Sequence, residues 1–353
     1  MAGPLSAAWL PLAIGSLPLS DPAEAWAWTG KYLPWSPAWP QLPRRSYLEH
    51  MVVQFSEHFP SIAIDLDSEQ VWVDRAQDLE RDLERLYLAY LQNDWTYGAI
   101  SSEYALGLHY LFDTEQVLAT SPLMIKGQVT GPITWGLALV DEVGHPVLHN
   151  EVLADAVAKH LRLKATWQEQ RLKAYAAQTI LFVDEPSMSF FGSATVPLSR
   201  DQILMLLEEV LAGIEGLKGV HCCGSTDWSL LLDTSADVLS LDAFGYAESL
   251  ALYPEAVSSF LDRGGTIAWG IVPSGPMIES ETATSLLDRL HQAIGLLVEK
   301  GISRDKLLAA GWVTPSCGLG SLDRQTAERV LELTAEVSDQ MRNQYVVSRE
   351  RSL

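Results

Sequence analysis

The sequence is short of cysteine, of basic residues and of long apolar runs, and each shortage excludes a class of protein. Its three cysteines are the neighbours Cys222 and Cys223 and the distant Cys317, so there is no disulfide framework, and a metal or catalytic role is expected. No apolar run reaches the roughly 18 residues of a membrane-spanning helix. The net charge of -21 argues against nucleic acids and anionic membranes as partners.

The beginning of the chain lacks the basic region of a secretory signal, because no lysine or arginine precedes Lys31. Apolar residues make up 48% of the sequence, which is enough for a sizeable core, and no long segment is polar enough to predict disorder. We therefore expect a cytoplasmic protein that folds as a single domain over residues 1–353.

Short apolar runs alternate with helical patterns along the chain. The strand candidates are 10–14, 123–129, 179–183, a short run at Val220, 238–241, 266–272 and 307–313, and the helical patterns are 23–33, 74–92, 151–177, 199–215, 281–300 and about 322–343. This alternation indicates an α/β protein with a parallel sheet. At least seven strand candidates fit a (β/α)8 TIM barrel with a short N-terminal extension, and a doubly wound open sheet is the alternative. The Pro- and Trp-rich stretch 34–45 is expected to be an ordered loop.

Chemically reactive residues cluster at the ends of these strand candidates. They are Ser16, Asp184, His221, Cys223, Asp242 and Cys317. In a barrel the carboxyl ends of the strands converge on one face, which carries the active site. Residues far apart in the sequence are therefore expected to meet there.

His221 and Cys223 have the spacing of two ligands on one side of an extended segment, because residues i and i+2 point the same way and Cys222 points to the other side. Cys317 would add a second sulfur and Asp242 a carboxylate, a ligand set that Zn2+ prefers. The spacing alone leaves the alternative open, since a lone cysteine is usually a small core residue and a lone histidine is usually just hydrogen-bonded.

Around these residues the sequence resembles the catalytic, C-terminal barrel of cobalamin-independent methionine synthase, and above all the short single-barrel core methionine synthases. The wider superfamily includes uroporphyrinogen decarboxylase and methylcobalamin:coenzyme M methyltransferases. The resemblance covers about residues 10–340. Its motifs are Ile14-Gly15-Ser16, Asp184-Glu185-Pro186, His221-x-Cys223 followed by Asp242, and Pro315-Ser316-Cys317-Gly318.

The resemblance implies a methyltransferase that activates the thiol of homocysteine on zinc and gives methionine. It implies that Ile14, Gly15 and Ser16 bind the carboxylate of homocysteine and that Asp184 binds its amino group. The implied zinc ligands are His221, Cys223, Asp242 and Cys317, and Asp242 stands where the family has a glutamate.

The sequence departs from that family in ways that bear on the methyl donor. It has no room for the second barrel that helps to hold a folate, and the loop 269–275 lacks the histidine thought to protonate the departing folate. These departures favour a methylcorrinoid donor, carried by a corrinoid protein that docks over the barrel mouth. A second carboxylate for the substrate amine is also missing: Val53 stands about where it is expected, and Glu57 or Glu103 is a possible substitute.

Three other functions compete with this interpretation. The first is methyl transfer to another thiol such as coenzyme M, which has no amino group for Asp184 to bind. The second is a lyase like uroporphyrinogen decarboxylase, whose chemistry uses no zinc. The third is a non-enzymatic barrel that binds zinc and a thiol but transfers nothing.

Overall fold

The structure, a computed structural model, describes residues 9–119 and 121–347. The prediction about a signal at the start of the chain therefore lies largely outside the described residues. Six parallel strands form one curled sheet in the order β3 (Met124–Thr130), β5 (Gln178–Asp184), β6 (Leu217–Cys222), β7 (Val238–Leu241), β8 (Thr266–Val272) and β9 (Gly311–Pro315). The predicted α/β class and parallel sheet are confirmed.

Two irregular segments near the N-terminus continue the hydrogen bonding beyond both edges of this sheet. Residues 10–17 form a bridge with β9 through Pro11 and Val313, and residues 37–41 form one with β3 through Ala38 and Lys126. A third bridge joins Ser16 to Gln41, so the two segments also meet each other. Prolines interrupt both segments, and because proline has no N–H group they cannot form regular ladders. A curled parallel sheet of six strands is thus confirmed, the closed (β/α)8 barrel stays a prediction, and the strand predicted at 10–14 is irregular.

The inner face of the curled sheet changes from apolar to polar along the strands. Near the amino ends a separate buried cluster fills the interior, made of Leu10, Leu12, Met124, Ile180, Phe182, Val238, Ala268 and Trp312. Side chains alternate along a strand, so the following inward positions are two residues further on. They carry the buried polar residues Lys126, Gln128, Ser240 and Thr314, together with His221 on β6 and the partly buried Asp184 on β5. This polar level is the floor of the functional site.

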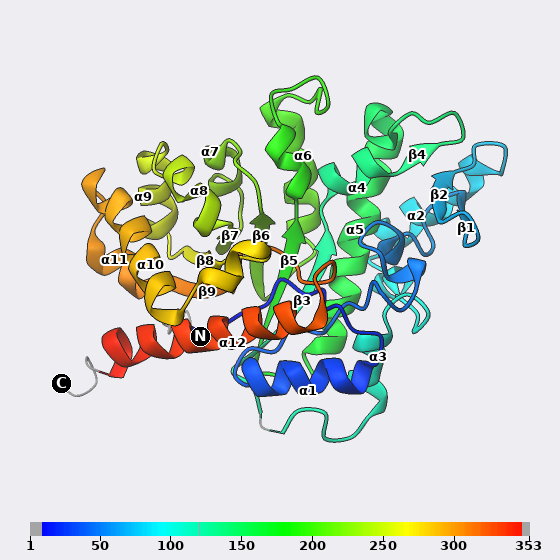
Figure 1. The fold of residues 1–353 in the computed structure, drawn as a ribbon. Helices are drawn as coiled ribbons and strands as arrows, with labels where there is room; N and C mark the ends of the chain where they lie inside the picture. Colours follow the sequence, from blue (N-terminus) through cyan, green and yellow to red (C-terminus); the bar gives the residue numbers. More distant parts are fainter. Residues whose placement is uncertain (1–8, 120, 348–353) are drawn as a thin grey trace.

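Helices cover the outside of the sheet. Their bounds are α1 Pro22–Tyr32, α2 Leu79–Leu91, α3 Leu106–Asp113, α4 Pro132–Ala138, α5 Glu151–Leu172, α6 Arg200–Leu211, α7 Trp228–Leu232, α8 Ala243–Leu250, α9 Pro254–Asp262, α10 Ala283–Glu299, α11 Arg304–Ala309 and α12 Arg324–Arg342. Helix α1 starts as its sequence indicates, with Asp21 as N-cap and Pro22 in the first turn. Figure 1 shows α1 and α12 side by side near the N-terminal strand segments. No helix in the described part of the chain is long and apolar enough to cross a membrane.

Several local predictions need correction. Residues 307–309, predicted as strand, belong to helix α11, and strand β9 begins only at Gly311. The helix predicted at 74–92 starts later, because Asp78 caps it. A small second sheet was not predicted: β1 (Ile62–Asp65) pairs with β2 (Gln70–Val73), which pairs with β4 (Val140–Asp141). This sheet projects away from the main one at the right of Figure 1.

A buried carboxylate fixes the loop after β5 against the start of α4. Glu185 accepts hydrogen bonds from the backbone N–H groups of Ile133 and Thr134, each at 2.8 Å, and from the Thr134 hydroxyl at 2.7 Å. Its side chain is fully buried. This contact places the neighbouring Asp184 at the carboxyl end of the sheet.

We predict that Glu185→Ala destabilises the fold by about 2–4 kcal/mol, because it leaves buried N–H groups without an acceptor. Urea unfolding of wild type and variant measures the change. Glu215→Ala is the matched control: it removes an exposed carboxylate paired with Lys173 and should cost less than about 1 kcal/mol. Equal effects of the two substitutions would contradict this role of Glu185.

Candidate metal and substrate site

Three of the predicted zinc ligands come together at the carboxyl end of the sheet. His221 lies near the end of β6, Cys223 directly follows that strand, and Cys317 follows β9. One ligand atom from each residue lies within 4.8 Å of the other two. The Nδ1 atom of His221 is hydrogen-bonded to the Ser240 hydroxyl at 2.9 Å, while its buried Nε2 atom has no partner in the described part of the chain. An imidazole fixed on one side and unpaired on the other suits a metal ligand.

The Cys223 and Cys317 sulfurs lie close enough to share one proton, which lowers the pKa of Cys317 and raises that of Cys223. The two thiols titrate as one pair, which holds one proton between its two sulfurs at neutral pH. One sulfur is therefore ready to bind a cation, and the other must lose its proton first.

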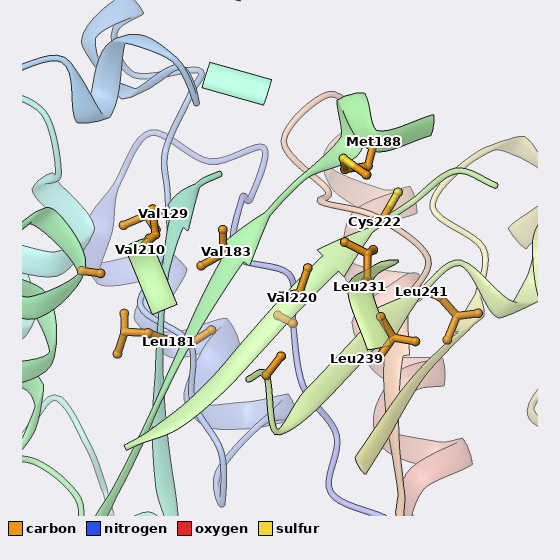
Figure 2. Close-up of a cluster of buried hydrophobic side chains, with 14 of the residues drawn as sticks. Val129, Leu181, Val183, Met188, Val210, Val220, Cys222, Leu231, Leu239 and Leu241 are labelled. Atoms are coloured by element: carbon orange, nitrogen blue, oxygen red, sulfur yellow. The ribbon is translucent and has the colours of Figure 1, made fainter. Parts of the chain in front are cut away.

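Cys222 faces the opposite side of β6, as the alternation predicts. Its side chain is fully buried in the main hydrophobic core. Figure 2 shows it beside Met188 and Leu231. The burial raises the pKa of the Cys222 thiol to about 12. Cys222 is thus a core residue, although it is adjacent in sequence to a candidate ligand.

Asp242 lies close to the three ligands but outside the group whose atoms fall within 4.8 Å. It is the N-cap of α8 and accepts from the Gly245 N–H at 2.8 Å. Burial raises the pKa of Asp242 to about 6, and the negative charge of Cys317 contributes to this rise. The carboxylate is therefore available near the ligands at neutral pH, and its role as the fourth ligand stays a prediction.

A cavity of about 470 Å3 opens over this group. Its walls consist of Ile14, Ser16, Gln41, Pro43, Arg44, Glu49, His50, Met51, Thr130, Asp184, Pro186, His221, Cys223, Cys317, Gly318, Gly320 and Ser321. The predicted substrate residues Ile14, Ser16 and Asp184 thus share one cavity with the candidate metal ligands. Gly15 itself is not part of the wall.

The Gly15-Ser16 loop is joined to the loop that carries Cys317. The Leu319 N–H donates to the Ser16 carbonyl at 3.0 Å, and the Gly320 N–H donates to the Ser16 hydroxyl oxygen at 3.2 Å. A Cβ atom on Gly318 would lie 2.4 Å from the same hydroxyl oxygen, so only glycine allows this approach. Among the described residues, no acceptor is bonded to the Ser16 N–H, which leaves this group free to bind an anion.

No donor among the described residues is hydrogen-bonded to the side-chain carboxylate of Asp184. Its Oδ1 atom is buried and unpaired within the described residues. Burial raises the pKa of Asp184 to about 6, against the opposing effect of the positive charge of Lys126. The Lys126 ammonium is fully buried and donates to the Ile14 carbonyl at 2.6 Å and to Gln128 Oε1 at 3.0 Å. A buried acceptor of this kind is costly unless a ligand supplies a donor.

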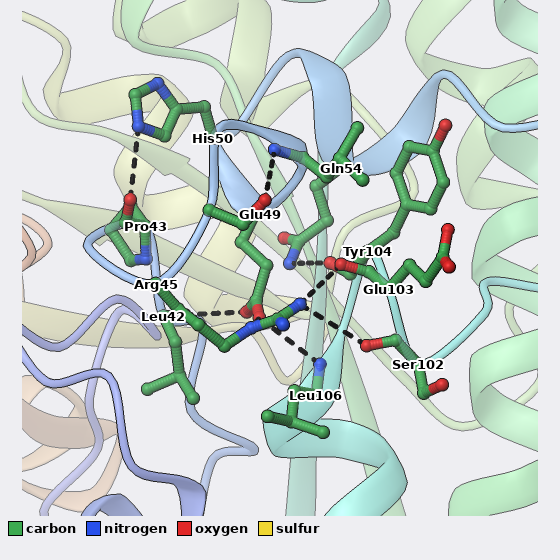
Figure 3. Close-up of polar contacts among 12 residues, drawn as sticks. Leu42, Pro43, Arg45, Glu49, His50, Gln54, Ser102, Glu103, Tyr104 and Leu106 are labelled. Carbon is green, nitrogen blue, oxygen red and sulfur yellow. Dashed lines mark hydrogen bonds and ion pairs between the residues drawn. The ribbon is translucent and has the colours of Figure 1, made fainter. Parts of the chain in front are cut away.

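Sequence reasoning missed six polar or charged residues of the cavity wall, namely Gln41, Arg44, Glu49, His50, Thr130 and Ser321. Four of them lie in or just after the second irregular segment, which was predicted only as a loop. Glu49 is buried and pairs with Arg45, and it accepts the Leu42 N–H at 3.0 Å, as Figure 3 shows. The suggested substitutes for the missing carboxylate are not in the wall: Glu57 accepts the Ser101 N–H, and the Glu103 carbonyl binds Arg45.

The loop after β8 carries hydroxyl groups instead of an imidazole. The N–H and the hydroxyl of Ser274 contact the Ser316 hydroxyl at 3.0 and 2.9 Å, which ties this loop to the one that carries Cys317. The sequence observation that residues 269–275 contain no histidine therefore holds at the site as well. The cavity wall does contain one imidazole besides His221, that of His50, which contacts the Pro43 carbonyl at 3.1 Å.

The fold has counterparts among solved structures. A methyltransferase from Methanosarcina mazei is 14% identical, with a TM-score of 0.54 over 90% of this chain and 85% of that chain. A B12-independent methionine synthase from Shewanella sp. W3-18-1, solved with selenomethionine, is 17% identical, with a TM-score of 0.45 over 67% of this chain and 68% of that one. At such identities the first match shows a shared fold, and the second is too distant to argue from. No protein-family model and no curated protein match the sequence.

We predict that zinc affinity rises about tenfold per pH unit between about pH 7 and 9. The raised pKa of Cys223 and the lowered pKa of Cys317 leave one thiol proton to be displaced, so affinity is lost as the pH falls. Competition with a chelator at several pH values measures the slope. A rise of about a hundredfold per unit would show two protonated thiols instead.

We predict that Ser240→Ala lowers zinc affinity about tenfold, because the hydroxyl orients the His221 ring from behind. The same chelator competition provides the measurement. Ser249→Ala is the control: that hydroxyl accepts from the Trp228 indole and donates to the Tyr246 carbonyl, and zinc affinity should stay unchanged. Unchanged affinity in Ser240→Ala would mean that packing alone orients His221.

Proposed function

We propose that this protein transfers a methyl group to the thiol of homocysteine, giving methionine, at a zinc ion held by His221, Cys223 and Cys317. The observation that carries the proposal is the convergence of these three ligands in one cavity with Ser16 and Asp184. Imidazole and two cysteine sulfurs fit Zn2+, and the unpaired Nε2 atom of His221 is free to bind it. Asp242 is the proposed fourth ligand.

A bound zinc ion would supply the acidity that keeps the substrate thiol deprotonated at neutral pH. The residues of the chain hold the rest of the substrate. The N–H and hydroxyl groups of Ser16 would bind its carboxylate, and Asp184 would accept hydrogen bonds from its ammonium group. Holding both groups aims the sulfur at the methyl donor, which converts an encounter between two molecules into a positioned reaction.

The unpaired carboxylate of Asp184 favours an amino-acid thiol over a thiol such as coenzyme M. A thiol without an amino group would leave Asp184 buried without a donor, at a cost of about 1–3 kcal/mol. Homocysteine supplies that donor. The free thiols of all three cysteines are also in keeping with the cytoplasmic location that we propose.

The proposed methyl donor is a methylcorrinoid, either methylcobalamin or a corrinoid protein, and not a folate. Transfer from folate leaves a poor nitrogen leaving group that needs an acid, and residues 269–275 contain no histidine to supply it. Transfer from cobalt leaves the electron pair on the metal and needs no proton. Exposed apolar side chains suit the flat face of a large corrin ring: Phe190 and Met277 lie in short helical turns after β5 and β8, Tyr246 lies in α8 after β7, and Met51 follows the second irregular segment.

The test is to incubate zinc-loaded protein with homocysteine and either methylcobalamin or methyl-tetrahydrofolate and to measure methionine. We expect methionine from the corrinoid donor only. Methionine from folate would overturn the donor assignment, and His50→Ala would then show whether His50 supplies the acid.

Turnover with coenzyme M in place of homocysteine would change the acceptor, and a purified protein without zinc would favour a lyase. Zinc and homocysteine binding without transfer from any donor would indicate a binding protein.

The adjacent cysteines give a matched pair of variants for this assay. Cys223→Ala removes a proposed ligand and should abolish both zinc binding and methionine formation. Cys222→Ala alters the core side of the same strand and should keep both, with only a loss of stability from the small cavity. Equal activity of the two variants would exclude the proposed zinc site.

A further inference from the structure

We infer that the side-chain carbonyl of Gln41 is a second acceptor for the substrate ammonium group, beside Asp184. The inference rests on the proposed function, because it concerns how the same site recognises an amino-acid thiol. Gln41 lies at the end of the second irregular segment, where its backbone bridges to Ser16. Its side chain is 8% exposed and lines the cavity together with Ser16 and Asp184. It therefore touches the space in which the polar end of the substrate would lie.

A chain of hydrogen bonds fixes which end of the Gln41 amide faces the cavity. The Tyr104 carbonyl can only accept, so the Gln54 amide must donate to it, at 2.8 Å (Figure 3). The Gln54 oxygen is then left to accept the Gln41 Nε2–H, at 2.6 Å. The oxygen of Gln41 is consequently turned away from Gln54, and no donor from residues 9–119 or 121–347 is bonded to it.

Glycine at position 15 makes room for this oxygen. A Cβ atom on Gly15 would lie 2.7 Å from Gln41 Oε1 and 2.8 Å from the side chain of Gln128. The φ angle of Gly15 is +149°, which other residues rarely adopt. The amide oxygen thus packs against the backbone that leads into Ser16. The predicted carboxylate-binding loop and the Gln41 acceptor are therefore parts of one surface.

The two acceptors differ in charge, and this difference suits their surroundings. Asp184 is negative and the buried Lys126 ammonium acts on it electrostatically, while Gln41 adds an acceptor without adding charge. An ammonium group has three donors, so a single carboxylate leaves some of them unpaired once water is excluded. A neutral amide oxygen at this place supplies a further acceptor, because the other carboxylate of the wall, that of Glu49, is already paired with Arg45 and the Leu42 N–H. Its removal should weaken the binding of amino thiols selectively.

The test is calorimetric titration of the zinc-loaded protein with homocysteine and with 4-mercaptobutyrate, its analogue without the amino group. We expect Gln41→Leu to weaken homocysteine binding about tenfold or more and to leave 4-mercaptobutyrate binding within about twofold. Gln41→Glu restores an acceptor, so it should bind homocysteine better than Gln41→Leu and the anionic analogue worse than wild type. Gln54→Leu removes the group that orients Gln41 and should show a weaker form of the same selective loss.

Zinc content and thermal unfolding show whether each variant folds. If Gln41→Leu does not fold, Gln54→Leu and Gln41→Glu provide the test. The inference is overturned if the ratio of the homocysteine affinity to the 4-mercaptobutyrate affinity is the same in Gln41→Leu as in wild type. If Gln41→Leu does not fold, the same criterion applies to Gln54→Leu and Gln41→Glu. Wild-type protein that holds zinc but binds no homocysteine would overturn the proposed function itself, a result distinct from a failure of Gln41 alone.

Discussion

The convergence of parallel strands at their carboxyl ends is the constraint on which the site depends. Helical crossovers bring every strand of the sheet back in the same direction, so the residues that follow β5, β6 and β9 meet at one edge. Below that edge the apolar cluster around Phe182 and Trp312 fills the interior. The cavity that holds the candidate ligands therefore lies at the polar level above it.

That polar level combines buried charges with groups that lack partners. Burial of a charged or polar group costs free energy unless a partner compensates it. Lys126 is compensated by two acceptors, whereas the Nε2 atom of His221 and the Oδ1 atom of Asp184 are not. Unpaired buried atoms that line one cavity point to a site shaped for a ligand and not to a site optimised for stability.

The sequence predicted those parts of the site that depend on strand periodicity. Strands β7 and β8 have the predicted bounds, and the opposite orientations of Cys222 and Cys223 follow from alternation alone. The second irregular segment could not be predicted, because Pro37 and Pro40 hide its strand-like course. The wall residues Gln41 and His50 were therefore not predicted either. Their identification needed the bridges to Ser16 and β3, which no local pattern in the sequence specifies.

The loops around the cavity are hydrogen-bonded to each other as well as to the sheet. The Ser16 carbonyl and hydroxyl accept N–H groups from the loop that carries Cys317, and the Ser316 hydroxyl bonds to the loop after β8. The position of a proposed metal ligand and that of a proposed substrate-binding residue therefore depend on the same few hydrogen bonds. Each loop also has an anchor of its own, because Lys126 on β3 donates to the Ile14 carbonyl and the Ser316 N–H donates to the Val272 carbonyl at the end of β8. The distance between a metal-bound sulfur and the amino-acid end of a substrate would therefore be set jointly by the contacts between the two loops and by these anchors on the sheet.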